Sequence, residues 1–313
     1  MAAARPAALT APEYTTFAEP SAGFQPVYSL IESARHSLDM TMYELVDPTA
    51  EHDLAADAKR GVDVRVFLDS AYSGGKDNQA AAVTLKAAGV HVEFAPSSLI
   101  VHQKTITVDN HTSDIMTANL TSEYYSTTAD FVVQDSNPAD VATVVQAFND
   151  DWGGDLAGKY YDVPIRGLHG NLIFSPESED TLVGLIESAR HTLQVSNEEM
   201  DSKTIEKALE SAARRGADVQ VLMTKDSSWD TAFTALKDSG VHIRLYPDSE
   251  KDLYVHAKSV VADGTTAYVG SINFSTSSTV YNRELGLLTT NPAVVQPVVA
   301  AWSKWWAAAP IDY

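Results

Sequence analysis

The sequence predicts an α/β fold built from two tandem repeats. Two observations point to it: helix-like and strand-like patterns alternate along the chain, and similar segments recur about 154 residues apart. Alternating strands and helices are typical of layered folds with helices on both faces of a sheet. The length of 313 residues, 44% of them hydrophobic, suits two domains of ordinary size or one large one.

Internal similarity indicates that the chain is a duplication. IESARHSLDM (31–40) recurs as IESARHTLQV (186–195), and AKRGVDVRVFL (58–68) recurs as ARRGADVQVLM (213–223). A nearly constant spacing between similar segments is the signature of two copies of one structural unit. Both copies should therefore fold alike.

The expected boundaries follow from the repeat. Residues 17–158 form the first repeat and residues 159–313 the second, with Gly and Pro interrupting the pattern over 153–168. Residues 1–16 are rich in Ala, Pro and Thr and lack an apolar signal core, so we expect a disordered segment or the start of a mature secreted chain. The expected location is extracellular, with a cytoplasmic protein as the alternative.

Each repeat is expected to alternate helix and strand. A helix is predicted over 25–38, where apolar residues fall on one stripe: Val27, Leu30, Ile31, Ala34 and Leu38. The elements predicted next are a helix over 51–60, a strand over 62–68, a helix near 77–88, strands over 90–94, 101–108, 114–119 and 129–134, and a helix over 139–152. The second repeat follows the same order and ends on a Trp-rich helix over 292–307.

Composition narrows the classes of function. A net charge of −20 and a pI of about 4.7 argue against a nucleic-acid-binding protein, because such proteins usually present a basic surface to phosphates. The absence of cysteine excludes disulfides, thiol chemistry and cysteine-ligated metals. No apolar run reaches 18 residues, so we expect no transmembrane helix.

Both copies contain the polar motif H-x-K-x-x-x-x-D, as VHQKTITVD and VHAKSVVAD. Alternate side chains of a strand share a face, so the His and Lys of each motif should point the same way. A hydroxyl and an amide should do the same in the next strand. The residues concerned are His102, Lys104, Thr117 and Asn119 in the first copy and His256, Lys258, Ser271 and Asn273 in the second.

A lone histidine in an apolar strand is more often structural than catalytic. Here the whole set recurs while the surrounding residues change. Burying polar groups on one strand face costs desolvation energy unless they form hydrogen bonds with each other or with a bound ligand. Imidazole, ammonium, hydroxyl and amide groups together supply a nucleophile or acid and donors for anionic oxygens. The set therefore favours a catalytic site over a structural role.

These motifs, with GSINFS at 270–275, resemble those of the phospholipase D superfamily over nearly the whole chain. The resemblance implies two α/β/α sandwich repeats packed about a pseudo-twofold axis, with both motifs in one interfacial site. It implies a phosphodiesterase that works through a phosphohistidine, with no cofactor and no metal. His102 would be the nucleophile and His256 the general acid.

The resemblance also implies roles for the neighbouring residues. Asp130 and Glu284, each 28 residues after a motif histidine, would orient an imidazole as the carboxylate of a catalytic triad does. Met116 stands where the second copy has Gly270 and is expected to narrow the site. The residues expected to bind the phosphate are Lys104, Lys258, Asn119, Asn273, Thr117 and Ser271, and those expected to support the motif turns are Asp109 and Asp263.

Four functions stay open at this point. The acidic charge favours a phospholipase D acting on phospholipid at a membrane or micelle surface, by hydrolysis or transphosphatidylation. A metal-independent endonuclease of the same superfamily would need a basic cleft, yet the chain has only 22 Lys and Arg. A non-catalytic phosphate-binding module should have lost one motif. A transferase of the cardiolipin synthase type usually carries membrane anchors. We expect a monomer, since an internal pseudo-dimer can form the site alone.

Apolar loop residues could help such an enzyme dock on a bilayer. The candidates are Trp229 and the segments 99–101 and 253–255, with ordinary core packing as the alternative. Tyr124 and Tyr125 follow the first motif asparagine and are expected to line the mouth of the site.

Overall fold

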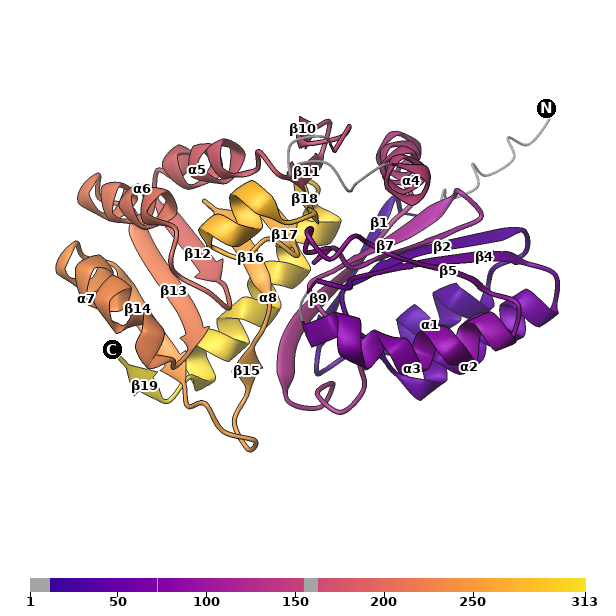
Figure 1. Ribbon diagram of the computed structural model, residues 1–313. Helices are drawn as coiled ribbons and strands as arrows, with labels where there is room; N and C mark the ends of the chain where they lie inside the picture. The colour runs from indigo at the N-terminus through magenta and orange to yellow at the C-terminus, as the bar shows by residue number, and fades with distance from the viewer. Residues whose placement is uncertain (1–11, 72, 155–162) are drawn as a thin grey trace, which may run out of the picture.

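The computed structural model describes residues 12–71, 73–154 and 163–313. In this part of the chain each half forms its own β-sheet, and the two halves stand side by side (Figure 1). The first sheet has the order β1-β9-β7-β6-β2-β4-β5, and the second contains β11-β18-β17-β16-β12-β13-β14 in the corresponding order. The predicted duplication of an α/β unit is therefore confirmed at the level of strand topology.

The bounds of the elements follow chain order. The first half contains β1 (Tyr14–Glu19), α1 (Gln25–Glu32), β2 (Ser37–Met42), β3 (Leu45–Val46), α2 (Pro48–Lys59), β4 (Asp63–Leu68), α3 (Ser73–Ala87), β5 (His91–Phe94), β6 (Thr105–Val108), β7 (Thr112–Met116), β8 (Leu120–Thr121), β9 (Thr128–Asp135) and α4 (Pro138–Gly153). The second half contains β10 (Gly167–His169), β11 (Leu172–Ser175), α5 (Glu179–Ser188), β12 (Thr192–Ser196), α6 (Lys203–Arg214), β13 (Asp218–Thr224), α7 (Asp230–Asp238), β14 (His242–Tyr246), β15 (Tyr254–Val255), β16 (Lys258–Ala262), β17 (Thr266–Gly270), β18 (Glu284–Thr289), α8 (Pro292–Ala308) and β19 (Ile311–Asp312).

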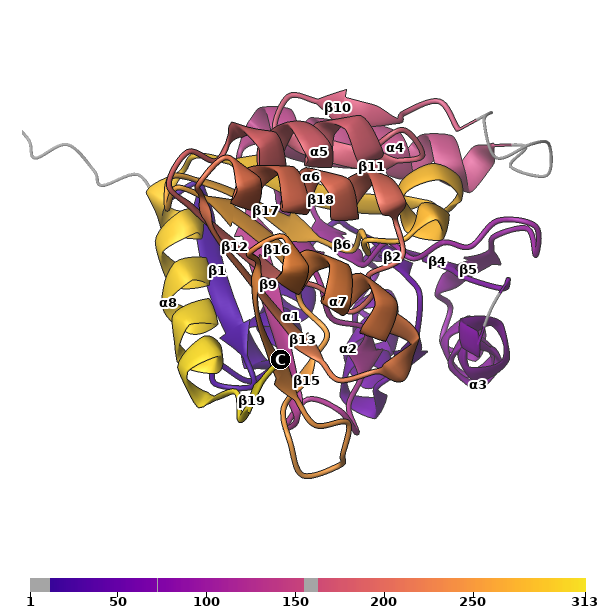
Figure 2. The ribbon, with the colours of Figure 1, turned by 90° about the vertical axis from the view of Figure 1, so that its left-hand side faces the viewer.

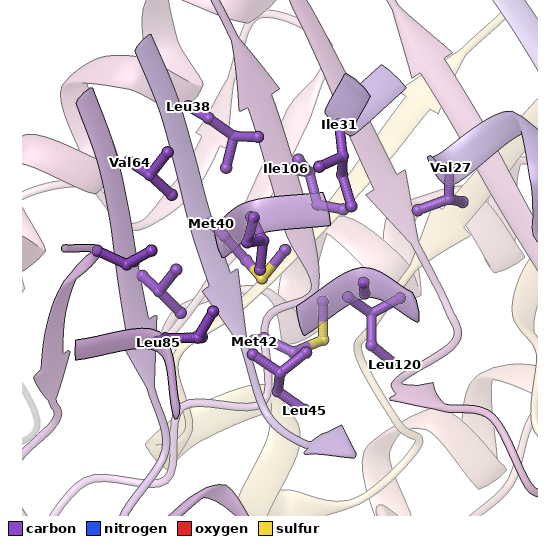
Figure 3. Packing of buried hydrophobic residues seen from close by; sticks show 14 of the residues in the cluster. Val27, Ile31, Leu38, Met40, Met42, Leu45, Val64, Leu85, Ile106 and Leu120 are labelled. Carbon is purple, nitrogen blue, oxygen red and sulfur yellow. The ribbon is translucent and has the colours of Figure 1, made fainter. Parts of the chain in front are cut away.

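Helices cover both faces of the first sheet, as predicted. Val66 and Leu68 of β4 belong to the core beneath α1, α2 and α3. Phe67, between them, points to the other face and packs with Phe148 of α4. Successive strand residues thus face opposite layers, and the apolar run from Val66 to Leu68 packs on both of them. Figure 3 shows side chains of α1, β2, β4 and β6 meeting in the first of these cores.

The first helix is shorter than predicted, because α1 ends before the apolar stripe does. Ala34 and Leu38 are buried in the same core, but Ala34 lies in a turn and Leu38 lies in β2. The turn is closed by Asp109, whose carboxylate accepts hydrogen bonds from the backbone N–H groups of Arg35, His36 and Ser37. Asp263 does the same in the second half, for Arg190, His191 and Thr192.

The N-terminal boundary also differs from the expected one. β1 begins at Tyr14 and pairs with β9 along its whole length, so residues 14–16 belong to the first sheet and not to a disordered segment. The expected tail over residues 1–11 lies outside the described residues, and so does the expected boundary between residues 158 and 159.

A third core joins the two halves. Phe131 and Val133 of β9 pack with Phe174 and Leu285 of the second sheet. α8 lies along β1, as Figure 2 shows, and completes this core. Its Trp302 is 1% exposed and packs in this core. A shared apolar core fixes how the two halves face each other, and hence how the two motifs meet.

Candidate active site

Each motif begins in one half of the protein and is held by the other. Val101, just before the first motif histidine, forms a parallel β-bridge with Arg283. At the corresponding place in the second half, Val255 pairs in parallel with Ala129, so β15 joins the first sheet through β9. The residues that follow Arg283 and Ala129 are the two carboxylates predicted to orient the histidines. The strand pairing therefore brings each carboxylate beside the histidine of the opposite half.

Two imidazole–carboxylate pairs result. Nδ1 of His102 lies 2.9 Å from Oε2 of Glu284, and Nδ1 of His256 lies 2.8 Å from Oδ1 of Asp130. Because an ionised carboxylate only accepts hydrogen bonds, both rings carry a proton on Nδ1, and Nε2 is left for chemistry. Both pairs cross the boundary between the halves, which the sequence alone did not indicate.

The motif lysines are buried at the points where the motifs enter their own sheets. The strand predicted over 101–108 begins only after Lys104, because the residues before it pair with the other half. Nζ of Lys104 donates to the backbone oxygen of His102 at 2.6 Å. Nζ of Lys258 donates to Oε2 of Glu198 at 2.8 Å. Both ammonium groups are thus fixed close to the imidazoles.

Two acidic residues of the site were missed by the sequence analysis. Nδ2 of Asn119 donates to Glu44 at 3.3 Å, and Nδ2 of Asn273 donates to Glu198 at 3.4 Å. Glu44 and Glu198 stand 154 residues apart, the same spacing as the motif histidines. Extending the repeat alignment to every polar residue would have found them.

The two predicted phosphate-binding hydroxyls lie behind the wall of the site. Thr117 donates to Oδ1 of Asp130 at 2.5 Å, and Ser271 donates to the backbone oxygen of Leu285 at 3.2 Å. Both are fully buried, and their bonds hold the strands that carry the two carboxylates. Met116 packs into the first core and does not narrow the site, contrary to expectation.

Burial and charge set the protonation of these groups. Burial lowers the pKa of His102 to about 4 and that of Lys104 to about 7. Burial alone would raise the pKa of Glu284, but His102 and Lys104 hold it below its ordinary value. Glu198 is likewise held well below its usual pKa, because the Lys258 ammonium outweighs the effect of burial. At neutral pH His102 is therefore a neutral imidazole beside an ionised carboxylate.

The two histidines have different surroundings. His256 faces a carboxylate at each ring nitrogen, since its Nε2 also lies 3.6 Å from Oε2 of Glu198. His102 is paired at Nδ1 and packs edge-on against the ring of Tyr43, with centroids 4.7 Å apart. The two imidazoles thus differ in their neighbours: His256 lies between two carboxylates, and His102 lies between a carboxylate and an aromatic ring.

Both histidines open onto one cavity of about 820 Å³ between the halves. Tyr124 and Tyr125 line it, as expected. Within the described ranges no lysine or arginine lines this cavity, and no group of three or more His, Asp and Glu side chains has metal-binding geometry. The acidic residues that line it are Glu44, Glu123, Asp130, Glu198, Glu199, Asp248, Glu250 and Asp252.

The loop residues proposed for bilayer docking are largely packed inside. Leu99 is 3% exposed and Val101 is fully buried, both in a small core with Phe148. Trp229 packs against the core of the second sheet, and Leu253 packs against the core between the halves. The expected apolar docking patch is therefore not formed by these residues.

Comparison with known proteins agrees with the site. The family described as "Cardiolipin synthase, PLD-like domain" matches residues 27–152 and 182–306, one match in each repeat. The chain belongs to the phospholipase D superfamily. Within it, cardiolipin synthase A from Proteus mirabilis (strain HI4320) is 26% identical over 305 residues, and that from Serratia proteamaculans (strain 568) is 28% identical over 305 residues. Each alignment covers 82% of this chain, which spans only 61% and 62% of those relatives' lengths.

Solved structures show the same fold. Phosphatidylserine synthase from Haemophilus influenzae Rd KW20 has a TM-score of 0.74 at 13% identity, over 96% of this chain and 88% of that one. Polyphosphate kinase from Porphyromonas gingivalis has a TM-score of 0.73 at 13% identity, over 94% of this chain and 47% of that one. None of the helices in the described parts of this phospholipase D superfamily member has the length and apolar composition needed to cross a bilayer.

Proposed function

We propose that this protein is a phosphodiesterase that hydrolyses glycerophospholipids or exchanges their headgroups through a phosphohistidine intermediate. The observation that carries the proposal is the pair of imidazoles, one from each half, each held at Nδ1 by a carboxylate of the other half and both facing one cavity. Such an arrangement supplies a nucleophile and an acid on either side of a single phosphorus atom.

The proposed first step is attack by Nε2 of His102 on phosphorus. The bond between phosphorus and the headgroup oxygen breaks, and His256 transfers its Nε2 proton to that oxygen. Water or an alcohol then gives a proton back to His256 and attacks the phosphohistidine, which frees His102. The low pKa of His102 keeps it unprotonated at neutral pH, and the two carboxylates around His256 suit a proton donor.

The charge on the non-bridging oxygens needs donors. The amides of Asn119 and Asn273, which line the cavity, are proposed as the donors, and the buried ammonium groups of Lys104 and Lys258 are proposed to supply positive charge from behind its wall. Because two ammonium groups can neutralise the phosphodiester, we expect full activity in excess EDTA. Asp130 and Glu284 are proposed to fix the tautomers of the histidines.

The alternative of an endonuclease is disfavoured by the cavity. Eight carboxylates line it, and no lysine or arginine of the described residues does, so the phosphate groups of a nucleic acid would be repelled throughout the cavity. The relatives named cardiolipin synthase and phosphatidylserine synthase support a phospholipid substrate. A transferase activity of that type is the same chemistry with an alcohol in place of water.

A paired assay tests this function. The protein, His102→Ala and His256→Ala are each incubated with mixed phospholipid liposomes and with single-stranded DNA, and products are identified by mass. We expect phosphatidic acid from the unaltered protein only. Cleavage of DNA, or lipid turnover that survives both substitutions, would contradict the proposal. An extracellular location and a monomeric state stay predictions, to be checked by fractionation and by light scattering.

A further inference from the structure

The cavity has an acidic rim that the catalytic chemistry does not use. We define the acidic rim as Glu123 from the loop between β8 and β9, and Asp248, Glu250 and Asp252 from the loop between β14 and β15. The two loops belong to different halves, so the rim surrounds the opening from both sides. Asp248 and Asp252 lie shortly before His256 in the chain, and all three line the cavity.

Aromatic side chains line the same space. Tyr43, Tyr124 and Tyr254 are among the lining residues, and Tyr124 is 53% exposed. The hydroxyl of Tyr254 donates to Oε1 of Glu198 at 3.0 Å, which ties the aromatic wall to an ionised carboxylate. Carboxylates combined with aromatic faces attract organic cations.

Two buried oxygens independently indicate a ligand. Asn273 is 3% exposed and Thr121 is 5% exposed, and both line the cavity. Oδ1 of Asn273 and Oγ1 of Thr121 have no hydrogen-bond partner among the described residues. Nδ2 of Asn273 faces Glu198, so the free oxygen of this amide is an acceptor. Buried polar atoms are nearly always paired, so these two call for a donor group from a bound molecule.

We infer that the cavity selects phospholipids whose headgroup alcohol carries a primary ammonium group. This inference rests on the proposed function and adds its substrate class. An ammonium group provides the hydrogen-bond donor for Asn273 and Thr121 and the positive charge that balances the acidic rim. An uncharged polyol headgroup supplies donors but no charge, and an anionic headgroup is repelled.

Binding of soluble diesters tests the inference without relying on turnover. Glycerophosphoethanolamine and glycerophosphoglycerol carry the same phosphodiester, and only the first has an ammonium group. Because the unaltered protein would cleave such a diester, the titration uses the full-length variant His102→Ala. We expect calorimetry to give at least roughly tenfold tighter binding of glycerophosphoethanolamine, since several partly exposed carboxylates each contribute modestly. Equal binding, preference for the glycerol diester, or no binding of either would overturn the inference.

Substitutions in the acidic rim test whether its carboxylates cause the preference for the ammonium diester. Glu123→Gln with Asp248→Asn should lower it roughly fourfold or more, because two of the rim charges are removed. Glu93→Gln, an exposed carboxylate on β5 outside the cavity, serves as the control and should leave it unchanged. Thermal melting confirms that each variant is folded. An unchanged preference in the double variant would overturn the role of the rim. Tight binding of the ammonium diester without any lipid cleavage would instead refute the proposed function and leave the inference standing.

Discussion

Replacement of Glu284 by Gln should disable the proposed nucleophile while leaving its surroundings intact. Oε2 of Glu284 lies 2.9 Å from Nδ1 of His102, and Oε1, which accepts a hydrogen bond from Nδ2 of Asn282 at 3.2 Å, lies 3.1 Å from the same ring nitrogen. A glutamine in this place would keep its oxygen toward Asn282, because Asn282 donates. Its NH2 group would then take the place of Oε2, the nearer of the two oxygens, beside Nδ1 of His102. Donation from this NH2 group favours the tautomer with the ring proton on Nε2, where the attacking lone pair is needed.

The corresponding change in a catalytic triad lowers turnover by about 10⁴-fold, so we expect a loss of roughly 10³- to 10⁴-fold in kcat for Glu284→Gln. The assay is headgroup release from phospholipid in mixed micelles, with thermal melting as the folding control. Adding Asn282→Ala should let the glutamine rotate and restore part of the activity. A kcat within tenfold of the unaltered protein, or no rescue by the second substitution, would refute this account of the His102–Glu284 pair.

The remaining predictions concern pH, acceptors and packing. Burial gives His102 a pKa of about 4 and Lys104 a pKa of about 7. The value of kcat/KM should therefore fall below about pH 4, where His102 gains a proton, and above about pH 7, where Lys104 loses one. A profile that stays flat up to pH 9 would contradict this. Ethanol should divert product from phosphatidic acid to phosphatidylethanol, detected by mass, and hydrolysis alone would argue against an intermediate open to alcohols. Gly286→Ala should lower the melting temperature by roughly 5 °C, equivalent to about 2 kcal/mol, since its Cβ would collide with the Tyr268 ring. The control Gly184→Ala meets nothing within 4 Å in α5 and should not destabilise the protein.

The repeat made much of this protein predictable. Spacing alone identified the duplicated α/β unit, and both histidines, both lysines and the two partner carboxylates proved to lie together. The ends of the elements were less predictable. Leu38 continues the apolar stripe of α1 but lies in β2. A single buried residue is compatible with the spacing of a helix and with that of a strand, so the pattern could not show where the helix ends. The strand before Lys104 was overextended for a different reason, since its first residues pair with the other half.

The sequence could not show that each carboxylate pairs with the histidine of the other half. Sequence spacing places Asp130 and Glu284 after the histidines, but only the packing of the two sheets decides that Asp130 serves His256 and Glu284 serves His102. The docking segments failed similarly, because Leu99 meets α4 from a distant part of the chain. An apolar loop residue is exposed only if no distant segment packs against it, and the sequence does not show whether one does.

The central claim is that His102 bonds to phosphorus while His256 carries the proton. The most direct test is to incubate His256→Ala with a phospholipid ester whose leaving group is a good one and needs no acid, quench in alkali, and identify the modified residue by peptide mass. The account predicts a phosphatidyl group on His102 that accumulates because the second step is slow. A label on any other residue, or rapid turnover with no covalent species, would contradict it.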